Sequence, residues 1–433
     1  MQRILSSQLA THIGERVTIA GWVHRRRLLK SVAFLIVRDR AGLAQVVVAG
    51  PAARDLLDTL TEETVVEVEA EVVANAAAPA GVELTNPVVR APHGAAVPPP
   101  FDLYRPQLAA TLPTMLDHAA LALRHPSRQQ AFRLSAAAVA GFRAALDAEG
   151  FVEVHTPKVV ASATESGANV FALDWFGRPA YLAQSPQFYK QTLVGVFERV
   201  YEVGPVFRAE PHDTVRHLAQ YTSLDVELGF IRDHRDVMRV LRTVLAAMTA
   251  SVAQREPAAV AALGLRLPEV PQTIPEVHFA DAVALVGAAL GEDLSAEPDL
   301  APAHERWLGE WARREHGSDW LFVTGYPMAK RPFYTHPDPA RPAYSNGFDL
   351  LFRGIELVTG GQRLHHYDDY VAALAAAGEP IGPYESYVEV FRHGMPPHGG
   401  FAIGLERFMM RLLGAGNVRE VTLFPRDLHR LTP

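Results

Sequence analysis

The first ninety residues contain five short runs in which hydrophobic and polar positions tend to alternate. The runs begin at Val17, Val32, Leu43, Thr64 and Val82. Each run is rich in β-branched residues, and alternation with a period of two predicts strands that bury one face. Between the third and fourth runs, the segment PAARDLLDTL begins at Pro51 and predicts a short helix. The N-terminal part of the chain is therefore expected to be a small β-domain.

Five strands with a helix between the third and the fourth follow the order of an OB-fold barrel. The exposed face of such a barrel commonly binds oligonucleotides. We therefore expect an OB-fold domain over residues 1–90, and another kind of small β-barrel is the alternative. Residues 91–113 then hold so many prolines that they predict no regular element, and the linker is expected to cover residues 91–125.

Residues 126–433 are expected to form a second, larger domain. Helices are expected over residues 127–149, 236–254, 280–290 and 406–413. Strand-like segments begin at Phe151, Tyr181, Arg199, Thr222, Trp320, Phe348 and Gly399. Because these segments follow one another without a helix after each, they predict a mostly antiparallel sheet flanked by helices. The fold class is therefore α+β.

Composition narrows the class of protein. The chain has 433 residues and no cysteine, which excludes disulfides, thiolate zinc sites and cysteine nucleophiles. No apolar run reaches the length of a membrane span, so we expect a cytoplasmic protein without a membrane partner. Residues 1–50 carry a charge of +6 within a chain of −7, which leaves −13 on the remainder. A basic N-terminal module on an acidic body is typical of a nucleic-acid-binding enzyme, and a solvated arginine-rich surface is the alternative.

The first candidate site is a strand, loop and strand around Arg208. The chain has no GxxxxGK[ST] phosphate loop and no GxGxxG turn, so side chains must hold any nucleotide. Arg208 and Glu210 end one predicted strand, and Arg216 and His217 precede the next. Guanidinium groups match phosphate oxygens, so this unit could hold a triphosphate. A surface hairpin with salt bridges is the alternative.

The second candidate is the predicted hairpin FDLLFRGIELVTGGQR, which we expect to turn at Arg353 and Gly354. In that register Asp349 faces Val358, and Glu356 becomes its diagonal neighbour within ~8 Å. Two carboxylates with the Thr359 hydroxyl could hold Mg²⁺ against the phosphates of ATP. A pair of exposed strand acids is the alternative.

The third candidate is HGGFAIGLERFMMRLLG, where a glycine-rich strand leads directly into an amphipathic helix. Gly400 and Gly404 permit close approach of the backbone, and Arg407 in the first helical turn could reach a terminal phosphate. A packing contact between strand and helix, relieved by glycine, is the alternative. The three candidate sites support one another, because they occur together in one chain and in this order.

Three segments in this order resemble the three motifs of class II aminoacyl-tRNA synthetases: GFVEVHTP with Pro157, YEVGPVFRAE followed by RHL, and GGFAIGLERF. TESGANVF, YLAQSPQFYKQ, ELVTGGQRLH and VTLFPRD look like the aspartyl enzymes, and the resemblance covers nearly the whole chain. No large domain separates the second and third motifs, which resembles the compact archaeal type. The resemblance implies a homodimer, with Pro157 at its interface, that activates L-aspartate with ATP and transfers it to tRNA-Asp.

The resemblance also implies roles for individual residues. The residues implied for ATP are Arg208, Glu210, Arg216, His217, Leu218, Tyr221, Glu356, Gly404, Leu405, Glu406 and Arg407. The residues implied for aspartate are Glu165, Gln187, Lys190, Arg208, Asp225, Thr359 and Arg363. Asp349, Glu356 and Thr359 would hold Mg²⁺, although Thr359 stands where this type often has serine. Arg208, Glu356 and Arg407 would be the catalytic residues.

Within these sets, Arg208 would contact the α-phosphate, Arg407 would hold the γ-phosphate, and Tyr221 would stack on adenine. Lys190 and Arg363 would receive the side-chain carboxylate of aspartate. Two cations around one carboxylate would explain selectivity for aspartate, because the side-chain amide of asparagine would leave these cations unpaired.

The barrel residues implied for the tRNA anticodon are His24, Arg25, Phe34, Gln45 and Pro79. Phe34 and Gln45 match a phenylalanine and a glutamine that contact central anticodon bases in the resembling family. Enzymes of this type that charge only tRNA-Asp tend to carry tryptophan where His24 stands and lysine near Pro79. Both departures imply a non-discriminating enzyme that also charges tRNA-Asn.

Three alternative functions remain open at this point. An asparaginyl-tRNA synthetase would share the OB-fold and all three motifs, but the QSPQFYK segment with Lys190 argues against it. An ammonia-dependent asparagine synthetase would have no use for the N-terminal barrel. A catalytically silent tRNA-binding paralogue would have no reason to keep Arg208, Glu356 and Arg407.

Overall fold

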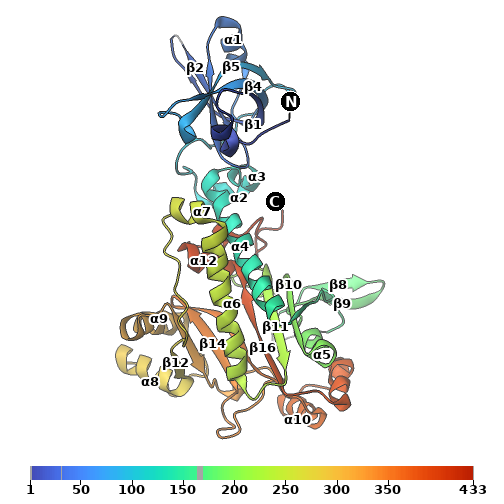
Figure 1. The fold of residues 1–433 in the computed structure, drawn as a ribbon. Coiled ribbons are helices and arrows are strands. Elements are labelled where there is room, and N and C mark those ends of the chain that lie inside the picture. The colour runs from blue at the N-terminus through green and yellow to red at the C-terminus, as the bar shows by residue number, and fades with distance from the viewer. Residues whose placement is uncertain (1, 31, 163–168, 433) are drawn as a thin grey trace. The chain divides into compact units, whose positions relative to one another are not determined.

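The computed structural model describes residues 2–30, 32–162 and 169–432 of the chain. By its internal contacts the chain divides into two compact units, Met1–Arg128 and Gln129–Pro433. Figure 1 shows the elements of each unit. Among the helices formed by the described residues, none is long and apolar enough to cross a membrane.

The N-terminal unit contains a closed five-stranded barrel in the order β1-β2-β3-β5-β4. Its elements are β1 (Arg16–Leu28), β2 (Ala33–Arg38), β3 (Leu43–Val48), α1 (Pro51–Thr59), β4 (Val65–Ala74) and β5 (Val82–Arg90). Leu35 and Val37 belong to its buried core, whereas Phe34 is only half-buried, as the alternation along β2 predicts. The OB-fold expectation, with a helix between the third and fourth strands, is confirmed.

The expected linker contains two short helices in its second half. Residues 91–111 form turns and irregular backbone, whereas α2 (Leu112–Asp117) and α3 (Ala119–Ala122) follow directly. Thr111 caps α2 by accepting a hydrogen bond from the backbone N–H of Thr114.

The second unit is built on an eight-stranded sheet that is antiparallel except at its two edges. In spatial order its strands are β12 (Glu276–His278), β13 (Trp320–Thr324), β14 (Gly347–Phe352), β15 (Ile355–Gln362), β16 (His398–Gly404), β11 (Gln220–Gly229), β10 (Arg199–Phe207) and β6 (Val152–Glu153). A small sheet is formed by β7 (Val159–Val160), β9 (Arg178–Leu182) and β8 (Ala172–Trp175). The prediction of a mostly antiparallel sheet with flanking helices is confirmed.

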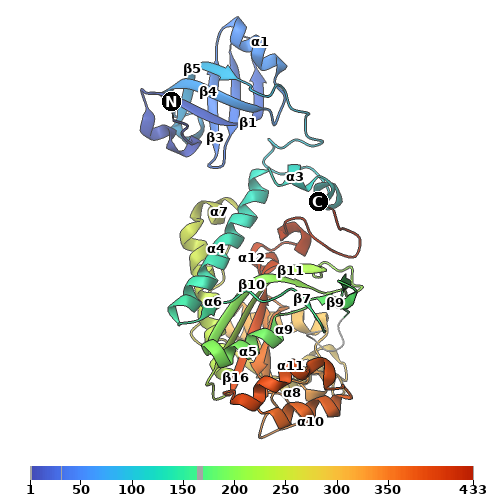
Figure 2. The same cartoon turned by 90° about the vertical axis from the view of Figure 1, so that its right-hand side faces the viewer.

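Helices cover this sheet, and the long pair α4 (Pro126–Ala148) and α6 (His234–Arg255) lies side by side (Figures 1 and 2). The pair packs closely, because a Cβ at Gly141 of α4 would meet the Ala247 carbonyl oxygen of α6 at 2.5 Å. The remaining helices are α5 (Gln187–Phe197), α7 (Pro257–Ala262), α8 (Phe279–Leu290), α9 (Pro302–His316), α10 (Tyr367–Ala377), α11 (Glu385–Val388) and α12 (Leu405–Leu413). Of these, the expectations from sequence did not include α5, α7, α9, α10 and α11.

The two faces of the central strands differ in chemistry. Along β11, Leu224, Val226 and Leu228 join the main hydrophobic core, which also contains residues of α4 and α6. The alternate positions Tyr221, Ser223, Asp225 and Glu227 point to the opposite face. Glycine or alanine occupies the matching positions of the neighbouring strand, at Gly400, Ala402 and Gly404 of β16. The polar face therefore has room for a ligand over the middle of the sheet.

The expected hairpin of β14 and β15 is present, but the pairing expected for Asp349 is wrong by one residue. Phe352 faces Ile355 and Leu351 faces Glu356, as predicted. A bulge between Leu350 and Leu351 then shifts the register, so that Asp349 lies opposite Thr359 instead of Val358. Thr359 is thereby placed directly across from Asp349.

Candidate active site

A pocket of about 540 Å³ lies on the polar face of the sheet. The residues implied for ATP or aspartate that line it are Gln187, Lys190, Arg208, Glu210, Arg216, His217, Leu218, Tyr221, Glu356, Thr359, Arg363, Gly404, Glu406 and Arg407. Two more, Asp225 and Asp349, are buried just behind lining residues. Residues more than 200 positions apart in the sequence thus meet in one cavity.

One residue implied for ATP lies away from this pocket, and one residue implied for aspartate is not described. Leu405 opens α12, but its side chain belongs to the hydrophobic core, because the strand-to-helix turn directs Gly404 and Arg407 toward the pocket instead. Glu165 lies outside the described residues.

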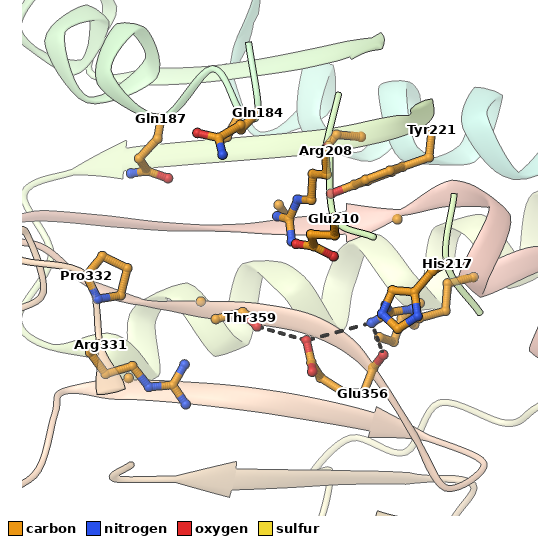
Figure 3. A pocket seen from close by; sticks show the side chains of 18 of the residues that line it. Gln184, Gln187, Arg208, Glu210, His217, Tyr221, Arg331, Pro332, Glu356 and Thr359 are labelled. Atoms are coloured by element: carbon orange, nitrogen blue, oxygen red, sulfur yellow. Dashed lines mark hydrogen bonds and ion pairs between the residues drawn. The ribbon is translucent and has the colours of Figure 1, made fainter. Parts of the chain in front are cut away.

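Arg208 follows directly after β10 and lies near the middle of the pocket (Figure 3). Its backbone N–H donates to the Ala219 carbonyl at 2.9 Å, which closes the loop that carries Glu210, Arg216 and His217. The guanidinium carbon lies 5.7 Å from the centre of the Tyr221 ring. A cation and an aromatic face are therefore presented together, as a nucleotide requires.

Arg407 and His217 occupy one end of the pocket. Arg407 Nη1 donates to the Glu356 carbonyl at 2.8 Å and lies 3.8 Å from the Glu356 carboxylate. Burial lowers the pKa of His217, and the neighbouring Arg407 lowers it further. His217 is therefore a neutral polar group beside a fixed guanidinium.

Glu406 ties α12 to β11. Both of its carboxylate oxygens accept from the Thr222 backbone N–H, at 3.1 and 3.0 Å, and burial raises the pKa of this carboxyl. Since Ser223 pairs with Gly404, this contact continues the strand pairing into the first turn of the helix. It fixes the position from which Arg407 reaches the pocket.

The opposite end of the pocket holds a buried network of charges. Lys190 Nζ lies 2.9 Å from Asp225 Oδ1 and 3.4 Å from Glu227 Oε2, and the lysine is only 2% exposed. Arg363 Nε donates to Glu227 Oε1 at 3.0 Å. Burial would raise the pKa of Glu227, but Arg363 and Lys190 outweigh it and hold this pKa below its ordinary value. Lys190 and Arg363 are therefore held at one end of the pocket by the carboxylates of Asp225 and Glu227.

Glu227 was not predicted from the sequence, and the role of Gly400 was predicted only in part. A Cβ at Gly400 would lie 2.1 Å from Glu227 Oε2, so glycine is required there to admit the carboxylate. Below the network, His398 is fully buried, and its Nδ1 lies 2.9 Å from the Pro396 carbonyl oxygen. Burial lowers the pKa of His398 to about 4, so this neighbour adds no charge to the network at neutral pH.

Asp349, Glu356 and Thr359 adjoin along the β14–β15 hairpin. Thr359 Oγ1 donates to Glu356 Oε1 at 3.1 Å (Figure 3). Arg331, which was not predicted, lies 3.3 Å from Asp349 and lines the pocket. Burial raises the pKa of Asp349 to about 6 against the opposing effect of Arg331, whereas Arg407 and Thr359 overcome burial to lower the pKa of Glu356.

Hard oxygen donors of this kind suit a cation such as Mg²⁺, which protein sites bind through one or two carboxylates together with phosphates. Within the described residues, no group of three or more carboxylate or imidazole side chains is arranged to hold a metal ion. The residues present fit a cation that is shared with a nucleotide.

A second pocket, of about 470 Å³, lies on the barrel. It is lined by Arg27, Leu29, Phe34, Gln45, Val47, Asn75, Ala77 and Glu83. Gln45 Nε2 donates to Glu83 Oε2 at 3.2 Å, which fixes the amide beside the half-buried Phe34 ring. An aromatic ring, an amide and an arginine in one groove suit a nucleic-acid base.

Two other residues implied for the anticodon are placed elsewhere on the barrel. His24 is buried next to Arg38, and burial lowers its pKa to about 4. The Arg25 guanidinium lies 4.5 Å from the centre of the Tyr104 ring. Arg27, rather than His24 or Arg25, shares the pocket with Phe34, to which it is paired across β1 and β2. The side chain of Pro79 lies outside the described part of the structure.

Residues 111–428 match the family described as tRNA synthetases class II (D, K and N), and residues 17–91 match the OB-fold nucleic acid binding domain. The chain belongs to the class II tRNA synthetase family. It is 44% identical to the Aspartate–tRNA(Asp/Asn) ligase of Thermus thermophilus, over the whole of both chains. It is 40% identical to the ligase of that name from Aeropyrum pernix, over 97% of this chain and 96% of the relative.

Solved structures of class II synthetases share the whole fold. An asparaginyl-tRNA synthetase from Pyrococcus horikoshii complexed with asparaginyl-adenylate superimposes with a TM-score of 0.94 at 29% identity, and the match covers all of both chains. An aspartyl tRNA synthetase from Entamoeba histolytica gives a TM-score of 0.88 at 28% identity, with 100% of this chain and 93% of the other covered. The fold is therefore common to enzymes named for two amino acids, and the pocket must distinguish them.

Proposed function

We propose that this synthetase activates L-aspartate with ATP and transfers it to tRNA-Asp and tRNA-Asn. The observation that carries the choice of aspartate is the network of Lys190 and Arg363 with Asp225 and Glu227 at one end of the pocket. A carboxylate can satisfy both cations, whereas an amide nitrogen would face a donor and leave buried groups unpaired. The names of the relatives with 38–44% identity agree with this choice.

In the proposed reaction, the aspartate α-carboxylate attacks the α-phosphorus of ATP in line, and pyrophosphate leaves. No side chain acts as a nucleophile. Arg208 stabilises the charge that develops on the α-phosphate, and Arg407 holds the terminal phosphate. Tyr221, on the face beside Arg208, stacks on adenine. A terminal ribose hydroxyl of the tRNA then attacks the carbonyl carbon of aspartyl-adenylate and displaces AMP.

Asp349, Glu356 and Thr359 would hold Mg²⁺, and the ion would supply positive charge against the ATP phosphates. The Glu356 carboxylate adds to the burial that raises the pKa of Asp349, and a bound cation would offset this repulsion between the two carboxylates. Glu356 also keeps Arg407 in place through its carbonyl and carboxylate, so Glu356 would contact both Arg407 and Mg²⁺.

The amino-acid assignment predicts that aspartate, and not asparagine, supports exchange of labelled pyrophosphate into ATP. We expect a preference for aspartate of at least about a hundredfold in kcat/KM, because the side-chain amide of asparagine carries no charge and would turn a donor NH2 group toward Lys190 or Arg363. The assay is pyrophosphate exchange with each amino acid in turn. A comparable or greater rate with asparagine would assign the chain to asparaginyl-tRNA synthesis instead.

The tRNA assignment predicts aspartylation of tRNA-Asp and tRNA-Asn with similar efficiency. The pocket of Phe34, Gln45 and Arg27 supports reading of anticodon bases, and loss of one stacking ring costs about 1–3 kcal/mol. Phe34→Ala is therefore expected to raise the KM for both tRNAs by about tenfold while pyrophosphate exchange is unchanged. Val88→Ala, an exposed position on β5 of the same barrel, is the control. A preference for tRNA-Asp above about a hundredfold would contradict the non-discriminating assignment.

We also propose that the enzyme is a cytoplasmic homodimer, with Pro157 at the interface. Pro157 is exposed between Thr156 and Lys158, which are both anchored to the buried carboxylate of Glu202, at 2.7 Å in each case. A fixed, exposed turn of this kind is suited to packing against a second copy. Sedimentation at micromolar concentration tests the oligomeric state.

A further inference from the structure

Helix α9 packs against the turn of the β14–β15 hairpin without intervening side chains. A Cβ at Gly309 of α9 would lie 2.4 Å from the Gly354 Cα, so the two backbones are in direct contact. Arg353, in the same turn, donates its backbone N–H to the Asp319 carbonyl at 2.8 Å, and its Nε lies 3.1 Å from the Asp319 carboxylate. The glycine contact fixes α9 relative to the hairpin that carries Glu356, and the Asp319 contacts fix the turn to the segment that follows α9.

The first turn of α9 carries Glu305, a buried acid that is 3% exposed and that the sequence analysis did not single out. Its Oε2 accepts from the Glu356 backbone N–H at 2.8 Å. Its two oxygens also accept from Arg216 Nη1, at 3.1 and 3.2 Å. The first turn of a helix is a favourable place for an acidic side chain, because the positive end of the helix dipole lies there.

Glu305 thus joins two segments that belong to the phosphate end of the pocket. Arg216 comes from the loop between β10 and β11, and Glu356 stands near the start of β15. Arg216 lines the pocket, whereas Glu305 lies behind it and does not. Among the described residues, Arg216 Nε and Nη2 have no hydrogen-bond partner, so two of its three nitrogens remain available to a ligand.

We propose that Glu305 is a positioning residue for ATP: it holds Arg216 in the orientation in which Nε and Nη2 bind phosphate oxygens. A long arginine on a loop loses rotamer entropy when it binds a ligand, and an ion pair formed beforehand removes part of that cost. The Glu305 carboxylate also holds the start of β15, where Glu356 contacts Arg407. The guanidinium groups of Arg216 and Arg407 therefore keep a fixed separation. The inference rests on the proposed use of this pocket for ATP.

The variant that tests this role is Glu305→Gln. Glutamine keeps an oxygen for the Glu356 N–H and nearly the same volume, but it removes the charge that orients Arg216. We expect the KM for ATP in pyrophosphate exchange to rise about tenfold, on the scale of a lost charge-assisted hydrogen bond. The KM for aspartate and kcat should change by less than about twofold, because the interaction contributes equally to ground and transition states. Glu310→Gln, at an exposed position of α9, is the matched control.

A double-variant cycle separates positioning from a general loss of structure. If Glu305 acts through Arg216, Glu305→Gln should add little to the ATP KM of an Arg216→Gln enzyme. Glu305→Asp keeps the charge and is expected to recover part of the ATP affinity. An unchanged ATP KM in Glu305→Gln, or an equal rise in both backgrounds, would overturn the inference.

Equilibrium binding of ATP without amino acid should weaken to the same extent, which provides a readout if turnover is lost. Unweakened ATP binding in Glu305→Gln would count against the inference. Failure of the proposed function is distinguished from failure of this inference, because it would appear as absent aspartate-dependent exchange in the unmodified enzyme.

Discussion

Arg208→Ala is expected to slow aspartate-dependent pyrophosphate exchange by about two to three orders of magnitude. The guanidinium lies in the middle of the pocket beside Tyr221, between the charge network at one end and Arg407 at the other. In the proposed reaction it meets the α-phosphate at that position, where negative charge increases as the aspartate carboxylate attacks. A fixed cation in a site shielded from water stabilises this charge far more than solvent does. The effect should therefore appear mainly in kcat.

The control for this variant is Arg178→Ala, which removes an arginine from an exposed position on β9. Unfolding monitored by circular dichroism should show that both variants keep the fold. Exchange at a near wild-type rate in Arg208→Ala would show that another group stabilises the α-phosphate.

Lys190→Met is expected to impair both aspartate activation and stability. The lysine is 2% exposed, and its removal leaves Asp225 and Glu227 buried with one cation fewer. Breaking a buried ion pair from one side costs about 3–5 kcal/mol of unfolding free energy. Under the proposed assignment the substrate carboxylate would lose a charge-assisted partner as well, so we expect kcat/KM for aspartate to fall about a hundredfold. Denaturant unfolding and pyrophosphate exchange measure the two effects separately.

The double variant Lys190→Met with Asp225→Asn distinguishes the two roles of the lysine when it is compared with Asp225→Asn alone, since Asp225 is itself implied to contact aspartate. It restores the balance of buried charge, so part of the lost unfolding free energy should return, whereas activation of aspartate should not. Activation that recovers together with stability would mean that Lys190 supports the fold without reading the substrate. An unchanged aspartate KM in Lys190→Met would mean that the carboxylate is recognised elsewhere.

The elements that the sequence predicted well are those whose pattern is local. The five barrel strands and α4 have clear periodicity and clear ends, and the structure reproduces them within a few residues. The bulge between Leu350 and Leu351 has no such signal, because an extra residue in a strand leaves its composition unchanged. Because of this bulge, Asp349 pairs with Thr359, whereas the sequence predicted pairing with Val358.

The site residues that the sequence analysis missed act through contacts that are distant along the chain. Glu305 meets Glu356 across 51 residues and Arg216 across 89, and Glu227 meets Arg363 across 136. Spacing along the sequence carries no information about such pairs. Arg331 comes from a segment whose only regular element is the short turn Met328–Lys330, so no periodic pattern drew attention to it. Motifs identified most of the predicted residues that line the pocket, and the fold revealed the residues that hold them in position.

Each unit of the chain has a hydrophobic core of its own. The barrel core draws all of its buried residues from positions 9 to 84, and the main core of the second unit begins at Leu134. Cooperative unfolding follows shared packing, so the chain should melt in two calorimetric transitions and not in one. Heating could then unfold one unit, with loss of the activity that depends on it, while the other unit stays folded. A preparation warmed past the barrel's own transition would still form aspartyl-adenylate but would no longer distinguish one tRNA from another by its anticodon.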